Sequence, residues 1–444
     1  MNKEFCEKQN FFSFSDIDFE RKGRIMKFTS AEATPAPHVP PGVPRLTGAA
    51  KEDIPMYRIQ TMNKISPVGL NRFPSELYEV GDAVQDPQGI LVRSAKLLDL
   101  EFNPGLLAIA RAGVGVNNIP LDRCAAAGIP VFSTPGANAN AVKELVICAM
   151  LMGSRDIPGA IRWVREQAAS GVDVSTVVEK GKSAFIGPEL YKKTLGIIGL
   201  GAIGSIVANT AIALGMDVYG YDPFLSVDTA LRLDRHVHVV KDINDLYKRS
   251  DYITMHIHYT EKTAHMIDAD AIAAMKRGVR VINLARGEIV DDEAMLTALD
   301  TGMVAAYITD FPNNRLLTAP HVIAMPHLGA STPESEQNCA AMAVDALRDY
   351  LENGNIRSSV NLPEMTMDRS GVQRLCVLHK NVPGMLANIT SLFGRDGVNV
   401  ENLSNKSRGD YAYTMVDLGS KVGDNVIEDV RRTANVIRVR SLEW

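Results

Sequence analysis

The segment from Thr194 to Asp222 constrains the fold more than any other part of the chain. Thr194–Ile198 is an apolar run of strand length, and a GxGxxG pattern of three glycines follows it, at Gly199, Gly201 and Gly204. The pattern opens a predicted helix over Ile203–Leu214. A strand, a glycine-rich turn and a helix in this order predict a βαβ unit of a parallel sheet.

The chemistry of this unit points to a dinucleotide. Gly199 permits a tight turn, Gly201 lets the backbone approach a pyrophosphate, and Gly204 lets the helix pack on the strand. The first turn of the helix offers free N–H groups to an anion. Asp222 ends the next predicted strand, where a carboxylate accepts hydrogen bonds from the adenosine ribose and repels a 2′-phosphate. The unit therefore predicts an NAD site rather than an NADP site.

Length and composition bound the rest of the chain. A chain of 444 residues exceeds one hydrophobic core and predicts two to four domains. The net charge of -5 and the absence of a Lys/Arg block argue against a nucleic-acid partner. No apolar run reaches the roughly 20 residues of a membrane span. The five cysteines form no CxxC pair, which favours a reducing, cytoplasmic location.

Short apolar runs alternate with amphipathic stretches along most of the chain and predict two series of βαβ units. We expect an α/β fold of two doubly wound parallel-sheet (Rossmann/flavodoxin-like) domains and a C-terminal βαββαβ ferredoxin-like module. The predicted boundaries are a Pro-rich disordered extension at 1–55, a discontinuous substrate-binding domain at 56–155 and 331–362, an NAD-binding domain at 156–330, and the module at 372–444.

Several motifs, in order, carry a resemblance to a known family. They are Arg111–Asn118, the glycine loop, Asn283–Asp291, Pro326–Thr332 and the C-terminal module. Over nearly all of 94–444 the chain resembles the D-2-hydroxyacid dehydrogenases, most closely the members that act on D-3-phosphoglycerate. The resemblance implies NAD-dependent oxidation of D-3-phosphoglycerate to 3-phosphohydroxypyruvate, the first step of L-serine biosynthesis. The module resembles an ACT domain, a regulatory unit that binds amino acids.

The resemblance also assigns roles to residues. Arg286 binds and polarises the substrate and His327 is the general acid/base, which suits a planar cation and a group that titrates near neutral pH. Implied substrate contacts are Arg93, Ser94, Arg111, Ala112, Gly113 and Asn138. Implied cofactor contacts are Val114, Gly199, Gly201, Ala202, Ile203, Gly204, Asp222, Ile257, Ala285, Asp310, His327, Gly329 and Ala330. Implied effector contacts are Asn381, Pro383, Gly384 and Met385.

One stretch departs from the family pattern. Members of the family usually carry a Glu a few residues after the strand that ends here at Asp310, and that Glu hydrogen-bonds the catalytic His. This chain has Phe311–Arg315 there, with no acid. The sequence leaves open which group orients the imidazole.

Other interpretations remain open at this point. The substrate can be a different 2-hydroxy acid, such as glycerate or 2-hydroxyglutarate, or the chain can be an NAD-sensing corepressor without catalysis. The module can bind L-serine as an effector or serve only in dimerisation, and we expect a homodimer or homotetramer. His256 and His258 have no acidic cluster near them, so no metal site is predicted.

Overall fold

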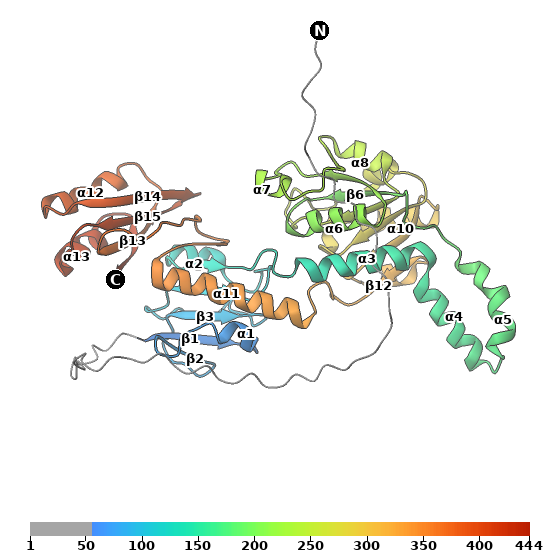
Figure 1. Cartoon of the computed structure of the whole chain (residues 1–444), viewed down its shortest axis with the longest axis horizontal. Helices are drawn as coiled ribbons and strands as arrows, with labels where there is room; N and C mark the ends of the chain where they lie inside the picture. Colours follow the sequence, from blue (N-terminus) through green and yellow to red (C-terminus); the bar gives the residue numbers. More distant parts are fainter. Residues whose placement is uncertain (1–55) are drawn as a thin grey trace, which may run out of the picture. The chain divides into compact units, whose positions relative to one another are not determined.

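The computed structural model describes residues 56–444 (Figure 1). The predicted disordered extension at 1–55 lies outside these residues. The described residues fall into three sheets, two parallel and one antiparallel. The predicted fold class is confirmed, while the predicted domain limits stay predictions.

The first sheet is parallel and covered by helices. Its strands are β1 (Tyr57–Met62), β2 (Tyr78–Gly81), β3 (Gly89–Val92), β4 (Ala108–Arg111) and β5 (Val131–Phe132). Their spatial order is β2-β1-β3-β4-β5, the flavodoxin-like order. The helices of this part are α1 (Pro67–Leu70), α2 (Leu121–Ala126) and α11 (Pro333–Asn353). Every residue of β3 is buried, as expected for a strand with both faces covered.

Helix α11 starts and ends at residues that define helix termini. The Thr332 side chain accepts a hydrogen bond from the Ser335 amide, and Pro333 occupies the first turn. Gly354 follows the last turn with φ +76°, in the left-handed region. The helix was predicted over Pro333–Glu352, and its start confirms that prediction.

The second sheet contains the glycine loop. Its strands are β6 (Thr194–Ile198), β7 (Asp217–Tyr221), β8 (Val237–Val240), β9 (Tyr252–Met255), β10 (Val279–Asn283), β11 (Val304–Thr309) and β12 (Val322–Ala324). All pairs are parallel, in the order β12-β11-β10-β9-β6-β7-β8. Strand order reverses at β6, which pairs with both β7 and β9. In an open α/β sheet, ligands bind at such a switch point, beyond the carboxyl ends of the strands.

Helices cover both faces of the second sheet. They are α3 (Ala139–Arg155), α6 (Ala202–Ala213), α7 (Val227–Ala230), α8 (Ile243–Arg249), α9 (Ala269–Ala273) and α10 (Asp292–Asp300), with short 3-10 turns η2 (Gly287–Ile289) and η3 (Leu316–Thr318). Helix α3 contributes Val146 and Met150 to the same core as β6 and α6. This helix therefore packs with the second sheet although it precedes residue 156.

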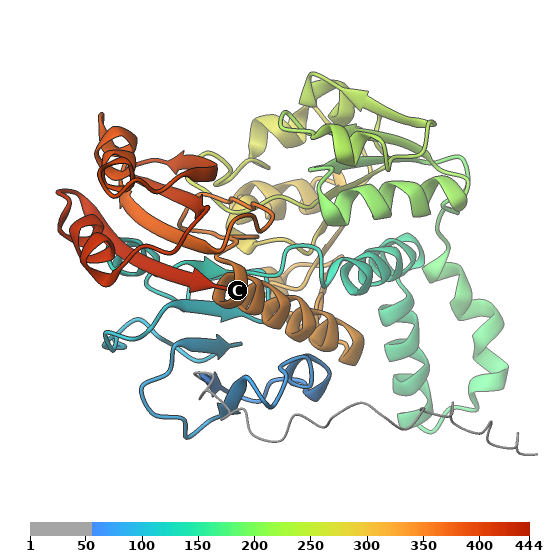
Figure 2. The same cartoon turned by 60° about the vertical axis from the view of Figure 1, so that its left-hand side comes forward.

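A helical hairpin extends from α3 and was not predicted from the sequence. It comprises α4 (Ile157–Ala169), α5 (Val174–Gly181) and the turn η1 (Lys182–Phe185). Both views show the two helices standing beside one another, away from the sheets (Figures 1 and 2). Neither α4 nor α5 has a buried residue.

The C-terminal module forms the predicted βαββαβ order. Its elements are β13 (Gln373–Lys380), α12 (Met385–Arg395), β14 (Val400–Arg408), β15 (Tyr411–Leu418), α13 (Asp424–Arg432) and β16 (Val436–Glu443), with sheet order β14-β15-β13-β16. Residues Ile389 and Val430 of the two helices pack with Leu375 and Val416 on one face of the antiparallel sheet.

The other face of this antiparallel sheet belongs to a core shared with the first sheet. Cys376, Tyr413 and Leu442 of the module lie in one buried cluster with Phe132 and Tyr350. We call this cluster the junction core. It joins strands from both ends of the described chain into one hydrophobic unit.

Arginines of the module also bind the C-terminal end of α11. Arg440 donates to the carbonyls of Tyr350 and Leu351, and Arg374 donates to the carbonyl of Asn353 at 2.8 Å. The last carbonyls of a helix lack partners within the helix, so these donors satisfy them. Arg374 is fully buried and forms a two-pronged ion pair with Asp417, at 2.6 and 2.7 Å.

Candidate functional site

The glycine loop has the geometry that a dinucleotide requires. Gly199 has φ +89°, and a Cβ there would lie 2.6 Å from the carbonyl oxygen of His256. A Cβ on Gly204 would lie 1.9 Å from the Gly199 carbonyl oxygen, so only glycine lets α6 start so close to the turn. Gly201 precedes the first helical residue, Ala202, whose turn presents free amides.

Asp222 lies directly beside this loop. Its Oδ2 accepts a hydrogen bond from the Leu200 amide and its Oδ1 accepts one from the Phe224 amide, both at 2.9 Å. A carboxylate accepts more than two hydrogen bonds. Fixed in this way, Asp222 keeps acceptor capacity for ribose hydroxyls. Ile257 borders the turn on its other side, with its Cγ2 2.7 Å from where a Gly199 Cβ would be.

A buried carboxylate oxygen marks the opposite end of the predicted NAD site. Asp310 follows β11 and is 1% exposed. Its Oδ2 accepts a hydrogen bond from the Gly329 amide at 3.2 Å, and its Oδ1 has no partner among the described residues. Burial raises the pKa of the Asp310 carboxyl, while the Gly329 amide and His327 lower it. An unpartnered buried acceptor is costly unless a ligand donor reaches it, so this atom fits a cofactor amide group.

All the residues predicted to bind substrate except Asn138 lie at the carboxyl ends of β3 and β4. The Nε of Arg111 donates to the Arg93 carbonyl at 3.0 Å. Burial lowers the pKa of the Arg111 guanidinium, and the nearby Arg286 and Arg93 cations lower it further. Arg286 reaches the same place from β10, because its Nη2 lies 3.1 Å from where a Cβ of Gly115 would be. Three cations from two sheets therefore gather at one position.

The remaining predicted site residues are placed as follows. Ser94 follows Arg93, and its amide donates to the Asn63 side chain at 3.0 Å. Asn138 precedes α3, and its Oδ1 is buried without a partner among the described residues. Ala112, Gly113 and Val114 follow β4, Ala285 precedes Arg286, and Ala330 follows Gly329. Their assigned contacts stay predictions.

Three residues with contacts to this site were missed from the sequence. Glu336, in the first turn of α11, pairs with Arg93 at 2.6 Å. Asn63 fixes the loop after β3. Phe311 contacts both predicted catalytic residues. Its ring centroid lies 4.6 Å from that of the His327 imidazole and 5.7 Å from the Cζ of the Arg286 guanidinium. None of these pairs is close in sequence, and no local pattern signals them.

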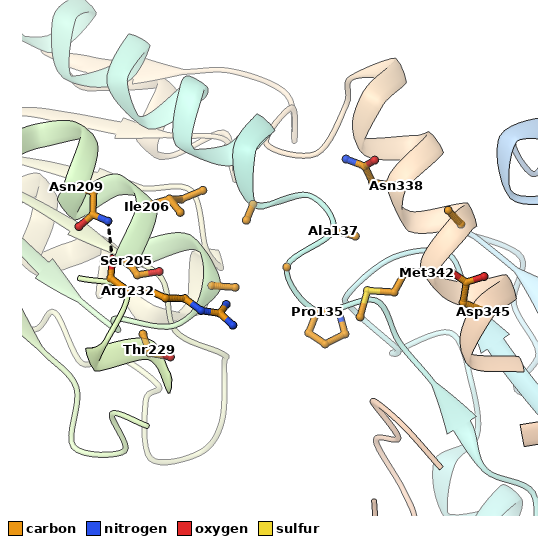
Figure 3. A pocket seen from close by; sticks show the side chains of 14 residues that line it. Pro135, Ala137, Ser205, Ile206, Asn209, Thr229, Arg232, Asn338, Met342 and Asp345 are labelled. Carbon is orange, nitrogen blue, oxygen red and sulfur yellow. Dashed lines mark hydrogen bonds between the residues drawn. The ribbon is translucent and has the colours of Figure 1, made fainter. Parts of the chain in front are cut away.

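A cavity of about 760 Å³ lies between α6 and α11 and is lined in part by the predicted cofactor contact Ala202 (Figure 3). Pro135 and Ala137 border it between the two helices, and the Arg232 side chain points toward it. Neither Arg286 nor His327 lines this cavity. It is therefore distinct from the predicted catalytic position.

Within residues 56–444, no cluster of three or more His, Cys, Asp or Glu side chains could hold a metal ion. None of the helices described over this range combines the length and apolarity needed to cross a membrane.

In the module, the predicted effector residues surround the start of α12. The Asn381 Nδ2 donates to the Gly409 carbonyl at 3.1 Å, which leaves the side-chain oxygen directed elsewhere. Pro383 and Gly384 precede the helix, Gly384 has φ +85°, and Met385 is its first, buried residue. Effector binding at this place stays a prediction.

Fold and site together define an NAD-binding α/β protein with arginines and a histidine beyond the carboxyl ends of its parallel strands. A family model described as D-isomer specific 2-hydroxyacid dehydrogenase, NAD binding domain, matches residues 147–329. The chain belongs to the D-isomer specific 2-hydroxyacid dehydrogenase family, on the strength of this match and of the relatives described next.

Two relatives and one solved structure illustrate the likeness. The D-3-phosphoglycerate dehydrogenase of Haemophilus influenzae is 31% identical over 82% of this chain and 88% of its own length. That of Synechocystis sp. is 36% identical over 71% of this chain, which spans 56% of that relative's length. A crystal structure of NAD+-bound 3-phosphoglycerate dehydrogenase from Entamoeba histolytica is similar with a TM-score of 0.54 and 26% identity, covering 69% of this chain and 99% of that one.

Proposed function

We propose that the chain catalyses NAD-dependent oxidation of D-3-phosphoglycerate to 3-phosphohydroxypyruvate, the first step of L-serine biosynthesis. The observation that carries this proposal is the group of three arginines, Arg93, Arg111 and Arg286, in one place near His327. The substrate carries a carboxylate and a phosphate, and guanidinium groups suit both. Relatives named D-3-phosphoglycerate dehydrogenase support the choice of substrate.

Each predicted site residue has its own role in the proposed reaction. Arg286 binds the substrate carboxylate and polarises the oxygen on C2. A nitrogen of the His327 imidazole accepts the hydroxyl proton. When bound, NAD would supply the acceptor for the hydride that leaves C2. Asp222 and the glycine loop would hold its adenosine and pyrophosphate, and the unpartnered Oδ1 of Asp310 would hold its other end.

The phosphate needs the remaining cations. Arg111 is free of an acidic partner among the described residues, whereas Arg93 is paired with Glu336. Arg111 is therefore the first phosphate contact, and Arg93 joins when the phosphate competes with the Glu336 carboxylate.

A substrate panel tests the proposal. NADH formation is measured with D-3-phosphoglycerate, D-glycerate and D-2-hydroxyglutarate, for the wild type and for Arg286→Lys and His327→Asn. We expect turnover of the phosphorylated acid, a loss of about 100-fold or more in kcat/KM for both variants, and no change for Arg315→Lys on the nearby surface. Preference for an unphosphorylated acid would make the chain another dehydrogenase of the family. NAD binding without turnover of any acid would favour the corepressor interpretation.

The module supports a regulatory role for L-serine. The Asn381 oxygen suits an amino group, and the amides at the start of α12 suit a carboxylate. Isothermal titration of L-serine, with Asn381→Ala as the variant and D-serine as the control ligand, measures this binding. No heat and no inhibition would leave a dimerisation role alone.

We further propose a homodimer or homotetramer. Ile161, Val164 and Val178 of the α4–α5 hairpin are exposed by 51%, 38% and 37%, and an apolar surface of this kind suits a second copy of the chain. A cytoplasmic location is proposed as well. The four cysteines of the described residues are free thiols, which a reducing compartment preserves. Light scattering of the intact chain measures the assembly.

A further inference from the structure

The ring of Phe311 contacts both members of the proposed catalytic pair. The His327 imidazole lies 4.6 Å from it, centroid to centroid, at an interplanar angle of 49°. The Arg286 guanidinium carbon lies over the ring, 5.7 Å from its centroid. Tilted aromatic pairs at this separation are attractive, as is a guanidinium above a ring face. A single uncharged side chain thus joins the cation to the acid/base.

The backbone around Phe311 is fixed on both sides. Its amide donates to the Thr309 Oγ1 at 3.0 Å, which closes a turn at the end of β11. Two residues later, Asn313 donates to the Asp292 carboxylate at 2.6 Å and accepts from the Leu316 amide at 3.0 Å. The segment is therefore tied to the first turn of α10. Such restraints fix the backbone from which the Phe311 ring projects.

The two side chains that the ring contacts have few other restraints. Among residues 56–444, none hydrogen-bonds the His327 imidazole. The neighbouring Asp310 uses its Oδ2 on the Gly329 amide. The Arg286 Nη1 donates to its own chain neighbour, the Ala285 carbonyl, and the guanidinium has no acidic partner there. Phe311 is the side chain that both share.

We infer that Phe311 is a positioning residue for the dehydrogenase reaction, whose ring holds the Arg286 guanidinium and the His327 imidazole at a fixed separation. The inference rests on the proposed function. In that reaction the carboxylate held by Arg286 is C1 of the substrate, and the proton accepted by His327 comes from the hydroxyl group on the adjacent carbon, C2. A fixed separation between the two groups therefore aligns both steps. A displacement of about 1 Å at such a site can lower the rate by about 100-fold.

The ring also takes the place of the Glu that members of the family usually carry within the Phe311–Arg315 stretch. A carboxylate would orient the imidazole by a hydrogen bond. Phe311 instead orients it by ring packing, and the same ring contacts the cation. Residues Asn313 and Arg315, which occupy the rest of the stretch, face α10 through Asp292 and Glu293.

Three variants test the inference. Phe311→Leu removes the ring but keeps an apolar side chain, Phe311→Tyr restores the ring, and Phe102→Leu is the matched control. Phe102 is also partly buried and also lies beneath a guanidinium, that of Arg123, at 5.1 Å. We expect kcat to fall about 10- to 100-fold in Phe311→Leu, with the KM for NAD unchanged. Phe311→Tyr should regain most of the activity, and Phe102→Leu should match the wild type.

A spectroscopic measurement separates this inference from the proposed function. In histidine-labelled protein, the ring current of Phe311 shifts the ring-proton resonances of His327, which His327→Asn assigns. We expect these resonances to move in Phe311→Leu and to stay near their wild-type positions in Phe311→Tyr and Phe102→Leu. This readout needs no substrate, so it holds even if the substrate panel finds no turnover. Unmoved His327 resonances, or a Phe311→Leu enzyme with wild-type kcat, would overturn the inference.

Discussion

The buried ion pair of Arg374 and Asp417 offers the sharpest test of how the C-terminal module is held. Both side chains have 0% exposure, and they meet through two short hydrogen bonds. Arg374 also donates to the carbonyls of Asn353, Met367 and Asp368. Removing one partner of a buried pair costs about 3 to 5 kcal/mol, because the other charge is left uncompensated.

Arg374→Met should therefore lower the free energy of unfolding by about 3 to 5 kcal/mol. The three carbonyls that lose their donor place the expected value at the upper end of this range. The double variant Arg374→Met/Asp417→Leu should lose less than either single change, since no buried charge remains. Arg432→Met is the control, because the Arg432 side chain is 74% exposed and its ion pair with Glu428 is worth at most about 1 kcal/mol.

Urea denaturation followed by tryptophan fluorescence measures these differences. Trp444 lies over the Arg374 guanidinium, 5.3 Å from ring centroid to Cζ, so its emission reports the pair directly. The chain has two tryptophans, and a Trp163→Phe background isolates this one. The reasoning is refuted if Arg374→Met costs no more than Arg432→Met, or if the double variant is less stable than both singles.

Three further predictions concern pH, cofactor choice and the junction core. Burial lowers the pKa of His256 to about 4 from an ordinary value of 6.5. As pH falls, the unfolded chain therefore binds the His256 proton before the folded chain does. The free energy of unfolding should decline between pH 6.5 and 4 by at most about 3 kcal/mol. Denaturation midpoints of His256→Gln should lack this decline. Asp222→Ala should raise the ratio of NADP to NAD affinity roughly tenfold or more in fluorescence titrations, because the repulsion of the 2′-phosphate is lost. Leu442→Ala should cost about 2 to 3 kcal/mol in thermal unfolding through the cavity it leaves.

The last two of these have matched control variants, and His256→Gln is compared with the wild type. Asp217→Ala changes an exposed acid at the start of β7, the strand that Asp222 follows, and should leave cofactor preference unchanged. Leu386→Ala shortens a leucine that is 37% exposed and should cost little. The pH prediction is contradicted if stability changes with pH equally in His256→Gln and the wild type. Unaltered discrimination against NADP in Asp222→Ala would contradict the cofactor prediction. A Leu442→Ala chain as stable as Leu386→Ala would contradict the prediction for the junction core.

The sequence predicted the parts of the fold that depend on local pattern. The apolar run at Thr194–Ile198 and the glycine spacing fixed β6 and α6, because turn chemistry and periodicity act over a few residues. The hairpin of α4 and α5 was missed, since neither helix buries a residue and no strand lies between it and α3. Site contacts between distant segments, such as Arg93 with Glu336, depend on how two sheets are placed and leave no local signal.

The contacts of Phe311 with the predicted catalytic residues could not be predicted from the sequence either. The sequence identified the stretch that lacks an acid, but not the group that contacts the imidazole in its place. Aromatic residues after a strand are common and usually pack in a core. The structure places the Phe311 ring between Arg286, which follows β10, and His327, which follows β12. Only this position distinguishes the inferred positioning role from ordinary core packing.

The junction core has a consequence for how the chain folds during synthesis. Residues Ile59 and Leu91 of the first sheet share this core with Leu442, so some of their packing partners are translated only after the second sheet. The second sheet, by contrast, completes its own core from residues before 326. The core of the first sheet should thus be completed after that of the second sheet, and until then its apolar surface is open to chaperones.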